Sequence, residues 1–274
     1  MAVVELTEEP RVDYLRAAIG LLAPSRPAGL PEVELVRRGV RTDRAHLTAY
    51  ESVCGFRVTD VLPATYPHLL AFPLAMRLMS GGEFPFPVVG LVHVANRITV
   101  RRPLVAQLPL DLSVRAEALR PHERGTRFDI VATATVDGAP VWSETSTYLS
   151  KNRGTGRRRE PAPAPASSAV WQVPARTGRD YAAVSGDRNP IHTSRLGARL
   201  FGFPRPIAHG MWTKARCLAA LEGRLPDAYT VDVAFQQPIL LPSRVSFAAW
   251  PESTGWEFSV HGDRPHLAGQ LTPP

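Results

Sequence analysis

An internal repeat limits most strongly what this chain can fold into. Three pairs of segments align in the same order along the two halves of the chain: 50–56 with 181–187, 68–79 with 208–218, and 92–104 with 231–243. In the last pair Pro103 coincides with Pro242, and the alternation of apolar residues stays in phase. Chance similarity between apolar segments would not be expected to keep this order three times. The repeat therefore predicts two copies of one α+β unit, a long helix packed against an antiparallel sheet.

Strand and helix patterns occur in the same order in both halves. Alternating apolar residues bounded by turn residues predict eight strands, at 88–100, 108–119, 127–136, 141–149, 229–235, 244–250, 256–261 and 266–271. An apolar helix is expected before each set of strands, at 69–79 and at 209–221. A short helix is expected at about 177–184. The fold class that follows is α+β.

A charged and proline-rich stretch separates the two halves. Residues 151–168 read KNRGTGRRRE followed by PAPAPASS. Alternating Pro and Ala can neither continue a helix nor pair as a central strand, so we expect an extended linker here. The expected domains are 1–150 and 169–274.

The composition is that of an ordinary globular protein with an excess of arginine. The net charge is +7, and Lys151 and Lys214 are the only lysines. This excess has two readings, a codon bias or an attraction to anions such as cofactor phosphates or an acidic carrier protein. The only dense basic run, Arg153–Arg159, lies in the linker, so no nucleic-acid partner is expected.

The sequence also bears on the compartment. No run of about 18 apolar residues occurs, and the acidic start lacks the pattern of a signal peptide, so no membrane partner is expected. Cys54 and Cys217 are too far apart in the sequence to indicate a disulfide framework or a zinc site. We expect a reduced, cytoplasmic protein.

Polar residues are concentrated just after the short helix expected at 177–184. Within eight residues, SGDRNPIH at 185–192 brings together Asp187, Asn189 and His192, and Gly-Asp and Asn-Pro predict a loop there. A carboxylate and an imidazole on one loop can share a water molecule and exchange its proton. Gly210, at the start of the next helix, has a free N–H that can bind a developing oxyanion. The structural alternative is that these residues are turn formers and a buried loop histidine.

The stretch from 181 to 211 resembles the hydratase 2 motif of the MaoC-like dehydratase family. The matching residues are Tyr181, Ser185, Gly186, Asp187, Asn189, Pro190, Ile191, His192, Ala198, Gly202, Phe203, Ile207, Ala208, His209, Gly210 and Met211. The resemblance implies a hotdog fold, doubled in this chain, and R-specific hydration of trans-2-enoyl thioesters or the reverse dehydration of (R)-3-hydroxyacyl thioesters. The phrases TYPHLLAFPLAMRLM and GLVHVANRIT are similar to the first half of actinobacterial 3-hydroxyacyl-thioester dehydratases.

The resemblance also assigns roles to single residues. Asp187 and His192 would activate the water and manage the proton at the α-carbon, and Asn189 would orient them. The Gly210 amide would polarise the thioester carbonyl. The residues expected to support the loop and bind the substrate are Tyr181, Ser185, Gly186, Phe203 and Met211.

No metal or cofactor is expected, although a metal site of Asp187, His192 and His209 is conceivable. We interpret His209 as structural. The thioester substrate could be carried by CoA or by acyl carrier protein. Two hotdog units in one chain resemble the usual hotdog dimer, so a monomer or a homodimer is expected.

The first half lacks the polar motif. Phe56 aligns with Asp187, Val61 with His192, and Ala71 with Gly210. We therefore expect the first half to be non-catalytic and to shape an acyl-chain groove, with the possible lining residues Phe72, Leu74, Met76, Phe84 and Phe86, for which core packing is the alternative. Two further functions remain open at this stage, a non-catalytic acyl-thioester binding subunit and a hotdog thioesterase.

Overall fold

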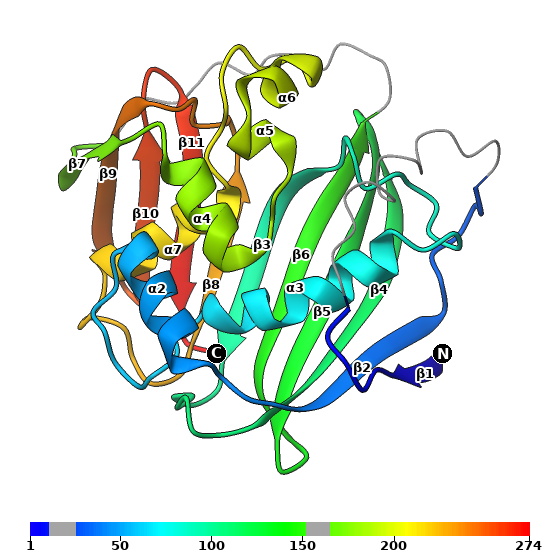
Figure 1. The fold of residues 1–274 in the computed structure, drawn as a ribbon. Helices are drawn as coiled ribbons and strands as arrows, with labels where there is room; N and C mark the ends of the chain where they lie inside the picture. The colour runs from blue at the N-terminus through cyan, green and yellow to red at the C-terminus, as the bar shows by residue number, and fades with distance from the viewer. Residues whose placement is uncertain (11–25, 152–164) are drawn as a thin grey trace.

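One continuous sheet runs through the molecule (Figure 1). In the computed structural model, which describes residues 1–10, 26–151 and 165–274, eleven strands follow the order β1-β2-β4-β5-β6-β3-β8-β11-β10-β9-β7. Their bounds are β1 Ala2–Glu5, β2 Val33–Val40, β3 Val92–Val100, β4 Leu110–His122, β5 Gly125–Val136, β6 Ala139–Lys151, β7 Ala169–Val173, β8 Tyr229–Phe235, β9 Ser243–Glu252, β10 Gly255–His261 and β11 Pro265–Thr272. Within the described residues every neighbouring pair is antiparallel except β1 with β2.

The sheet is built from two copies of one strand pattern that meet at its centre. There β3 pairs with β8, so that Ala95 lies opposite Ala234 and Ile98 opposite Val231. Outward from this seam the order is β3-β6-β5-β4-β2 on one side and β8-β11-β10-β9-β7 on the other. Apart from β1, which pairs with β2 at the outer edge, the two orders are equivalent when the strands of each half are numbered in chain order. The predicted α+β repeat is confirmed.

The helices repeat in the same way. Their bounds are α2 Arg44–Cys54, α3 Tyr66–Met79, α4 Thr177–Ser185, α5 Pro190–Thr193, α6 Arg195–Leu200 and α7 Gly210–Ala220. The helices α2 and α4 end at the aligned glycines Gly55 and Gly186, both with a positive φ, 82° and 73°. A left-handed residue of this kind closes a helix most easily when it is glycine. The YxxVxG pattern shared by residues 50–55 and 181–186 therefore marks the same kind of helix ending in both halves.

The core lies between the curved sheet and the helices. Helix α3 crosses the concave face of the first half (Figure 1) and buries most of its side chains, including Leu74 at 0% exposure. The indole N–H of Trp142, on β6, donates to the Ala64 carbonyl at 2.7 Å and so ties the start of this helix to the sheet. The two halves also pack against each other, since His46 Nε2 lies 2.7 Å from the Val184 carbonyl.

Some sequence expectations were wrong in detail. Residues 88–91 do not extend β3, because Val88 to Gly90 form a turn in which Gly90 has a φ of 95°. The expected loop after α4 contains two short helices, α5 and α6. Asn-Pro begins a helix here, because Asn189 caps it through its side chain and Pro190 takes the first position, where no N–H is needed.

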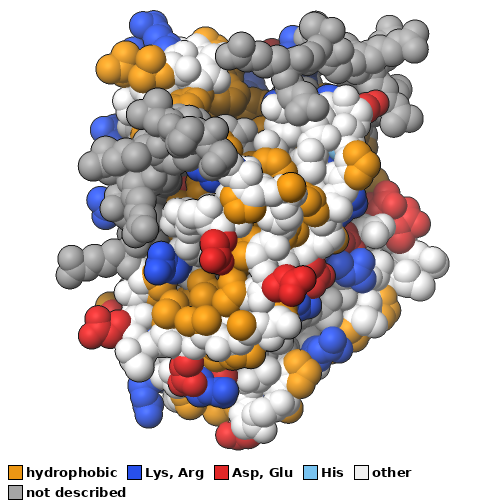
Figure 2. All heavy atoms as spheres, turned by 90° about the vertical axis from the view of Figure 1, so that its right-hand side faces the viewer, with side chains coloured by type: hydrophobic (Ala, Val, Ile, Leu, Met, Phe, Trp, Pro, Cys, Tyr) orange, Lys and Arg blue, Asp and Glu red, His pale blue; other side chains and the backbone are white. Residues whose placement is uncertain are grey.

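Four further observations concern the linker, membrane-spanning helices, the two cysteines and the surface charges. Most of the expected linker, residues 152–164, lies outside the described residues. In the part of the chain that the structure describes, no helix is long and apolar enough to cross a membrane. Cys54 and Cys217 are both buried as free thiols. On the face shown in Figure 2, acidic and basic side chains are interspersed among apolar and uncharged groups.

Candidate active site

The end of α4 positions Asp187. Gly186 closes the helix, and the next residue is Asp187, whose backbone N–H donates to Ser185 Oγ at 3.2 Å. Its carboxylate accepts a hydrogen bond from the Asn189 N–H, 3.1 Å from Oδ1. Asn189 in turn accepts from the Ile191 N–H at 3.3 Å as it caps α5. The loop therefore fixes one oxygen of the carboxylate through the residue that starts the next helix.

His192 faces this carboxylate from α5. Its Nδ1 lies 2.8 Å from the Ile207 carbonyl, which can only accept, so Nδ1 carries the proton. Nε2 then presents its lone pair, 4.0 Å from Asp187 Oδ2. Burial lowers the pKa of His192 below its ordinary 6.5, although Asp187 opposes the shift. At neutral pH the imidazole is therefore an uncharged base beside a carboxylate.

His209 stands behind this pair. Its ring stacks on His192 with 3.7 Å between the centroids, and its Nε2 lies 3.0 Å from the backbone carbonyl of Asp187. Burial, and then the charge of His192, lower the pKa of His209 to about 3, so it stays neutral. It contacts both Asp187 and His192 and fixes their spacing, as expected of a structural histidine.

Whether the site fits a metal ion depends on three of its side chains. Asp187, His192 and His209 offer ligand atoms within 4.8 Å of one another. However, His209 Nε2 must donate its proton to the Asp187 carbonyl, so that atom has no lone pair for a cation. Next to that atom only His192 Nε2 and the carboxylate remain as ligands, and the lone pair of His209 lies on Nδ1, which is buried without a hydrogen-bond partner among the described residues. The arrangement fits a hydrogen-bonded water better than a metal.

Gly210 begins α7 next to the same site. As the first helical residue it has a backbone N–H with no partner inside the helix, at the positive end of the helix dipole. A Cβ here would lie 3.0 Å from the ring of Phe235. Glycine therefore allows that ring to pack directly against the helix start.

The sequence interpretation missed Gly178. It lies in α4, and a Cβ at this position would stand 2.1 Å from the backbone oxygen of His192. Only glycine lets α4 approach the α5 backbone this closely. The available signal was a glycine inside a predicted helix, where it is unfavourable and needs a reason.

A cavity of about 980 Å³ opens in front of these residues, and both halves line it. Of the residues expected to bind substrate, those that line the cavity are Tyr181, Ser185, Phe203 and Met211. Gly186 does not line it and instead ends α4. Of the apolar residues considered for a groove in the first half, Phe72 and Met76 line the cavity, whereas Leu74, Phe84 and Phe86 pack in or against the core.

Basic side chains are numerous around the same cavity. The lining includes Arg124, Lys151, Arg205, Arg244 and Arg264, against the acidic Asp187 and Asp263. This excess gives the cavity a positive character away from the Asp187 carboxylate, which favours the approach of an anionic ligand.

Two features identify the class of protein: the duplicated halves, and the loop of the second half that places Asp187 and His192 beside the start of α7. The family model of the MaoC-like domain matches residues 159–262. The chain belongs to the MaoC-like dehydratase family and has its double-hotdog fold. It is 39% identical over 270 residues to 3-hydroxyacyl-thioester dehydratase X of Mycobacterium tuberculosis, covering 94% of this chain and 96% of the relative.

Two further comparisons agree with this placement. The crystal structure of HtdX from Mycobacterium tuberculosis superposes with a TM-score of 0.80 at 36% identity, covering 88% of this chain and 100% of that one. Enoyl-CoA hydratase ChsH3 of the same organism is 29% identical over 190 residues, 65% of this chain and 66% of the relative. The two relatives compared by sequence are named a dehydratase and a hydratase, which are the two directions of one reaction.

Proposed function

We propose that the chain is a hydro-lyase that adds water reversibly to trans-2-enoyl thioesters and forms (R)-3-hydroxyacyl thioesters. The observation that carries this function is the Asp187–His192 pair, 4.0 Å apart, beside the Gly210 helix start in one cavity. Family membership and the relatives' names support the reaction class. The R stereochemistry follows from the likeness to the hydratase 2 motif.

The addition of water can be written with the residues present. A water molecule held between Asp187 and His192 loses one proton to His192 Nε2 as its oxygen bonds to C3 of the enoyl group. The electrons of the C2–C3 double bond move onto the thioester carbonyl, where the Gly210 N–H stabilises the enolate oxygen. The imidazolium then returns its proton to C2, so the enzyme ends in its starting state.

The surroundings of His192 suit both halves of this proton cycle. The Ile207 carbonyl holds the tautomer in which Nε2 is the base. When the ring becomes cationic, the Asp187 carboxylate 4.0 Å away stabilises it. Asn189 keeps that carboxylate in place through its backbone N–H. His209 stays neutral, stacks on His192 and contacts the Asp187 backbone, so it supports the pair without taking part in the proton transfer.

The cavity also suggests how the rest of the substrate binds. The apolar side chains of Phe72 and Met76 on α3 would contact the acyl chain, so the first half would act as a binding wall without catalysis. The basic side chains around the cavity would attract the phosphates of a carrier, CoA or acyl carrier protein. We further propose a cytoplasmic protein that is self-sufficient as a pseudo-dimeric monomer or forms a homodimer.

One alternative, a hotdog thioesterase, would require a carboxylate on the central helix. Neither α3 nor α7 contains Asp or Glu. The other alternative, a binding subunit without turnover, does not explain why both Asp187 and His192 are present and aligned. We therefore prefer the hydro-lyase.

A substrate assay separates these functions. Purified protein mixed with crotonyl-CoA should reduce the absorbance of the conjugated thioester, and the product should be (R)-3-hydroxybutyryl-CoA on a chiral column. Free thiol should not appear, and its release at the rate of substrate loss would instead identify a thioesterase. Tight binding without any loss of absorbance, over a series of chain lengths and on both carriers, would identify a binding subunit.

A further inference from the structure

The first half contributes polar side chains to the cavity that the proposed reaction does not use. His68 on α3, His93 on β3 and Tyr148 on β6 all line it. Around them the wall is apolar, with Phe72 and Met76 among the neighbours. An acyl groove that accepted only hydrocarbon would gain nothing from imidazoles at this position, because buried polar groups are unfavourable unless they are hydrogen-bonded.

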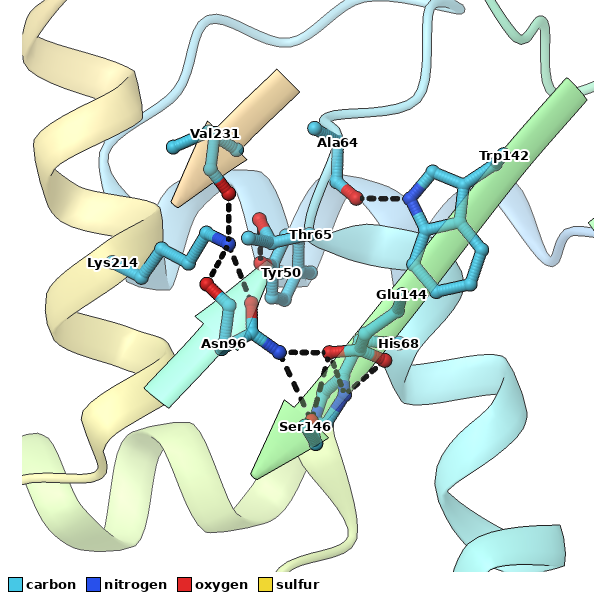
Figure 3. Close-up of polar contacts among 10 residues, drawn as sticks. All are labelled: Tyr50, Ala64, Thr65, His68, Asn96, Trp142, Glu144, Ser146, Lys214 and Val231. Carbon is cyan, nitrogen blue, oxygen red and sulfur yellow. Dashed lines mark hydrogen bonds and ion pairs between the residues drawn. The ribbon is translucent and has the colours of Figure 1, made fainter. Parts of the chain in front are cut away.

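A buried network holds His68 in place (Figure 3). Its Nδ1 lies 2.9 Å from the carboxylate of Glu144, which is only 4% exposed. Asn96 Nδ2 donates to the same carboxylate and, at 3.0 Å, to Ser146 Oγ. Behind Asn96, the fully buried Lys214 donates to the Val231 carbonyl at 3.1 Å and to Asn96 itself. The imidazole is thus held at the end of a chain of fixed contacts.

The network also determines which atom of His68 is offered to a ligand. Burial alone would raise the pKa of Glu144, but His68 and Asn96 outweigh it and the pKa is lowered, so the carboxylate stays ionised. An ionised carboxylate only accepts, so His68 Nδ1 carries a proton toward it. The other nitrogen, Nε2, is left for a ligand. The buried carboxylate is itself compensated by Lys214, through Asn96.

His93 adds a second nitrogen to the same part of the wall. Its Nε2 is buried and has no hydrogen-bond partner among the described residues. Its ring stacks on Tyr148 at 4.7 Å between centroids and lies against Phe235 at 4.8 Å. Burial, and then the charge of His68, lower the pKa of His93 to about 3, so the ring is neutral. A buried nitrogen without a partner is costly and calls for a polar ligand.

The position of these histidines relative to Gly210 indicates which part of a substrate they meet. The Phe235 ring contacts both the Gly210 helix start and His93. A thioester carbonyl at Gly210 would therefore lie within one aromatic ring of His93. A chain that continues past this ring toward α3 would bring carbons beyond C3 next to His68 and His93.

Resting on the function proposed above, we propose that His68 and His93 form a second polar subsite, which binds a hydroxyl group carried on the acyl chain beyond the C2–C3 double bond. Nδ1 of His68 is engaged with Glu144 and the ring of His93 with the Ala95 backbone, so each Nε2 offers a lone pair. A hydroxyl can donate its proton to either lone pair, whereas a group that only accepts cannot. A substrate carboxylate only accepts and would approach the ionised Glu144. The preferred substrate class is thus a hydroxylated enoyl thioester.

The test compares pairs of enoyl-CoA substrates of one chain length, with and without a hydroxyl, as the hydroxyl is moved along the chain. For the best position, the ratio of kcat/KM between hydroxylated and plain substrate should be at least about 10, because a site built for a hydroxyl is left unpaired by the plain chain. His68→Leu should lower this ratio about 10-fold or more. Met76→Leu, a matched apolar change in the same wall, should affect both substrates alike and keep the ratio.

If His68→Leu is too unstable to assay, a double variant takes its place. The single variant leaves Glu144 short of a donor, so His68→Leu/Glu144→Gln, which removes the charge and keeps an oxygen to accept from Asn96, should fold and show the same loss of ratio. A ratio near 1 at every position in the unaltered protein, or one that survives both variants, would overturn the subsite. If neither substrate is hydrated, the proposed reaction fails. Calorimetric binding of saturated acyl-CoA with and without the hydroxyl then still tests the subsite.

Discussion

The two halves of the molecule keep one fold and differ where their first helix ends. After α4, residues 186–209 hold Asp187, the short helices α5 and α6, and the approach to Gly210. After α2, residues 55–65 lead to α3 with Phe56 and Val61 at the aligned positions. The strand order and the glycine helix endings survive in both copies. We infer that core patterns maintain this fold, whereas the proposed chemistry depends on one polar insertion.

The first half nevertheless contributes side chains to the cavity. Its helix α3 supplies Phe72 and Met76 to the cavity, and His68 from the same helix is held by Glu144. We infer a division of labour in which the second half carries the reacting groups and the first half selects the acyl chain. The following variants test that comparison, with matched changes at aligned or similar positions.

The largest effect is expected at the acid/base pair. Asp187→Asn or His192→Gln should lower kcat/KM for crotonyl-CoA about 10³-fold, since a positioned general acid/base contributes about 10²–10⁴-fold. The matched change at the aligned position, Val61→Gln, alters a side chain that is 47% exposed and should leave the rate unchanged. Equal losses of kcat/KM in His192→Gln and Val61→Gln would contradict the proposal that only the second half carries the reacting groups.

The next effect concerns the helix starts. Gly210→Ala places a Cβ 3.0 Å from the Phe235 ring and should displace the amide, lowering kcat about 10-fold to 100-fold, somewhat less than loss of an oxyanion donor. The aligned reverse change, Ala71→Gly, lies in the core of α3. It should cost about 1 kcal/mol of stability through helix propensity and leave kcat unchanged. Because alanine keeps the backbone N–H, an unchanged kcat in Gly210→Ala would contradict the claim that the close packing against Phe235 positions this amide.

A smaller effect is expected where α4 meets α5. Gly178→Ala would bring a Cβ to 2.1 Å from the His192 oxygen, so the two helices must separate. We expect a lower Tm, equivalent to about 1–3 kcal/mol of overpacking strain, together with a several-fold lower kcat. In the first half, Gly82 has open space around its Cβ position, so Gly82→Ala should change neither. An unchanged Tm in Gly178→Ala would show that this close contact does not hold the loop.

The pH dependence sharpens the role of His192. Burial lowers its pKa, so the neutral base persists below the ordinary value of 6.5 and is lost only on further acidification. The acid limb of kcat/KM for hydration should therefore have its midpoint below pH 6.5. A midpoint above 6.5 would mean that the imidazole is held in its charged form and acts first as an acid.

The smallest effect is a change in stability at the seam between the halves. Burial lowers the pKa of Lys214 from 10.5 to about 7, against the opposing charges of Glu144 and Asp232. The unfolded chain then binds more protons above pH 7, so the free energy of unfolding should rise from pH 7 toward 8.5 and fall as pH drops through 7. In Lys214→Met this rise should be smaller in urea titrations. Parallel curves for the two proteins would show that Lys214 titrates normally.

Most of the fold and the main residues of the proposed site could be predicted from the sequence, but the contacts that hold them in place could not. Tyr229–Phe235 and the meander strands were predictable because apolar alternation is local. Asp187, His192 and Gly210 were found because they lie within one motif. The close approach at Gly178, the stacking of His209 on His192 and the His68–Glu144 contact join residues that are distant in sequence or independent of any pattern. Only the packed chain shows them.

We propose that the duplicated fold keeps a single reaction site, built by the second half in a cavity shared with the first. The most direct measurement is the binding stoichiometry of a non-reactive thioether analogue of the enoyl-CoA substrate, determined by calorimetry on the intact chain. We expect one molecule bound per chain, with that binding weakened by His192→Gln and unaffected by Val61→Gln. Two equivalent molecules per chain would contradict it.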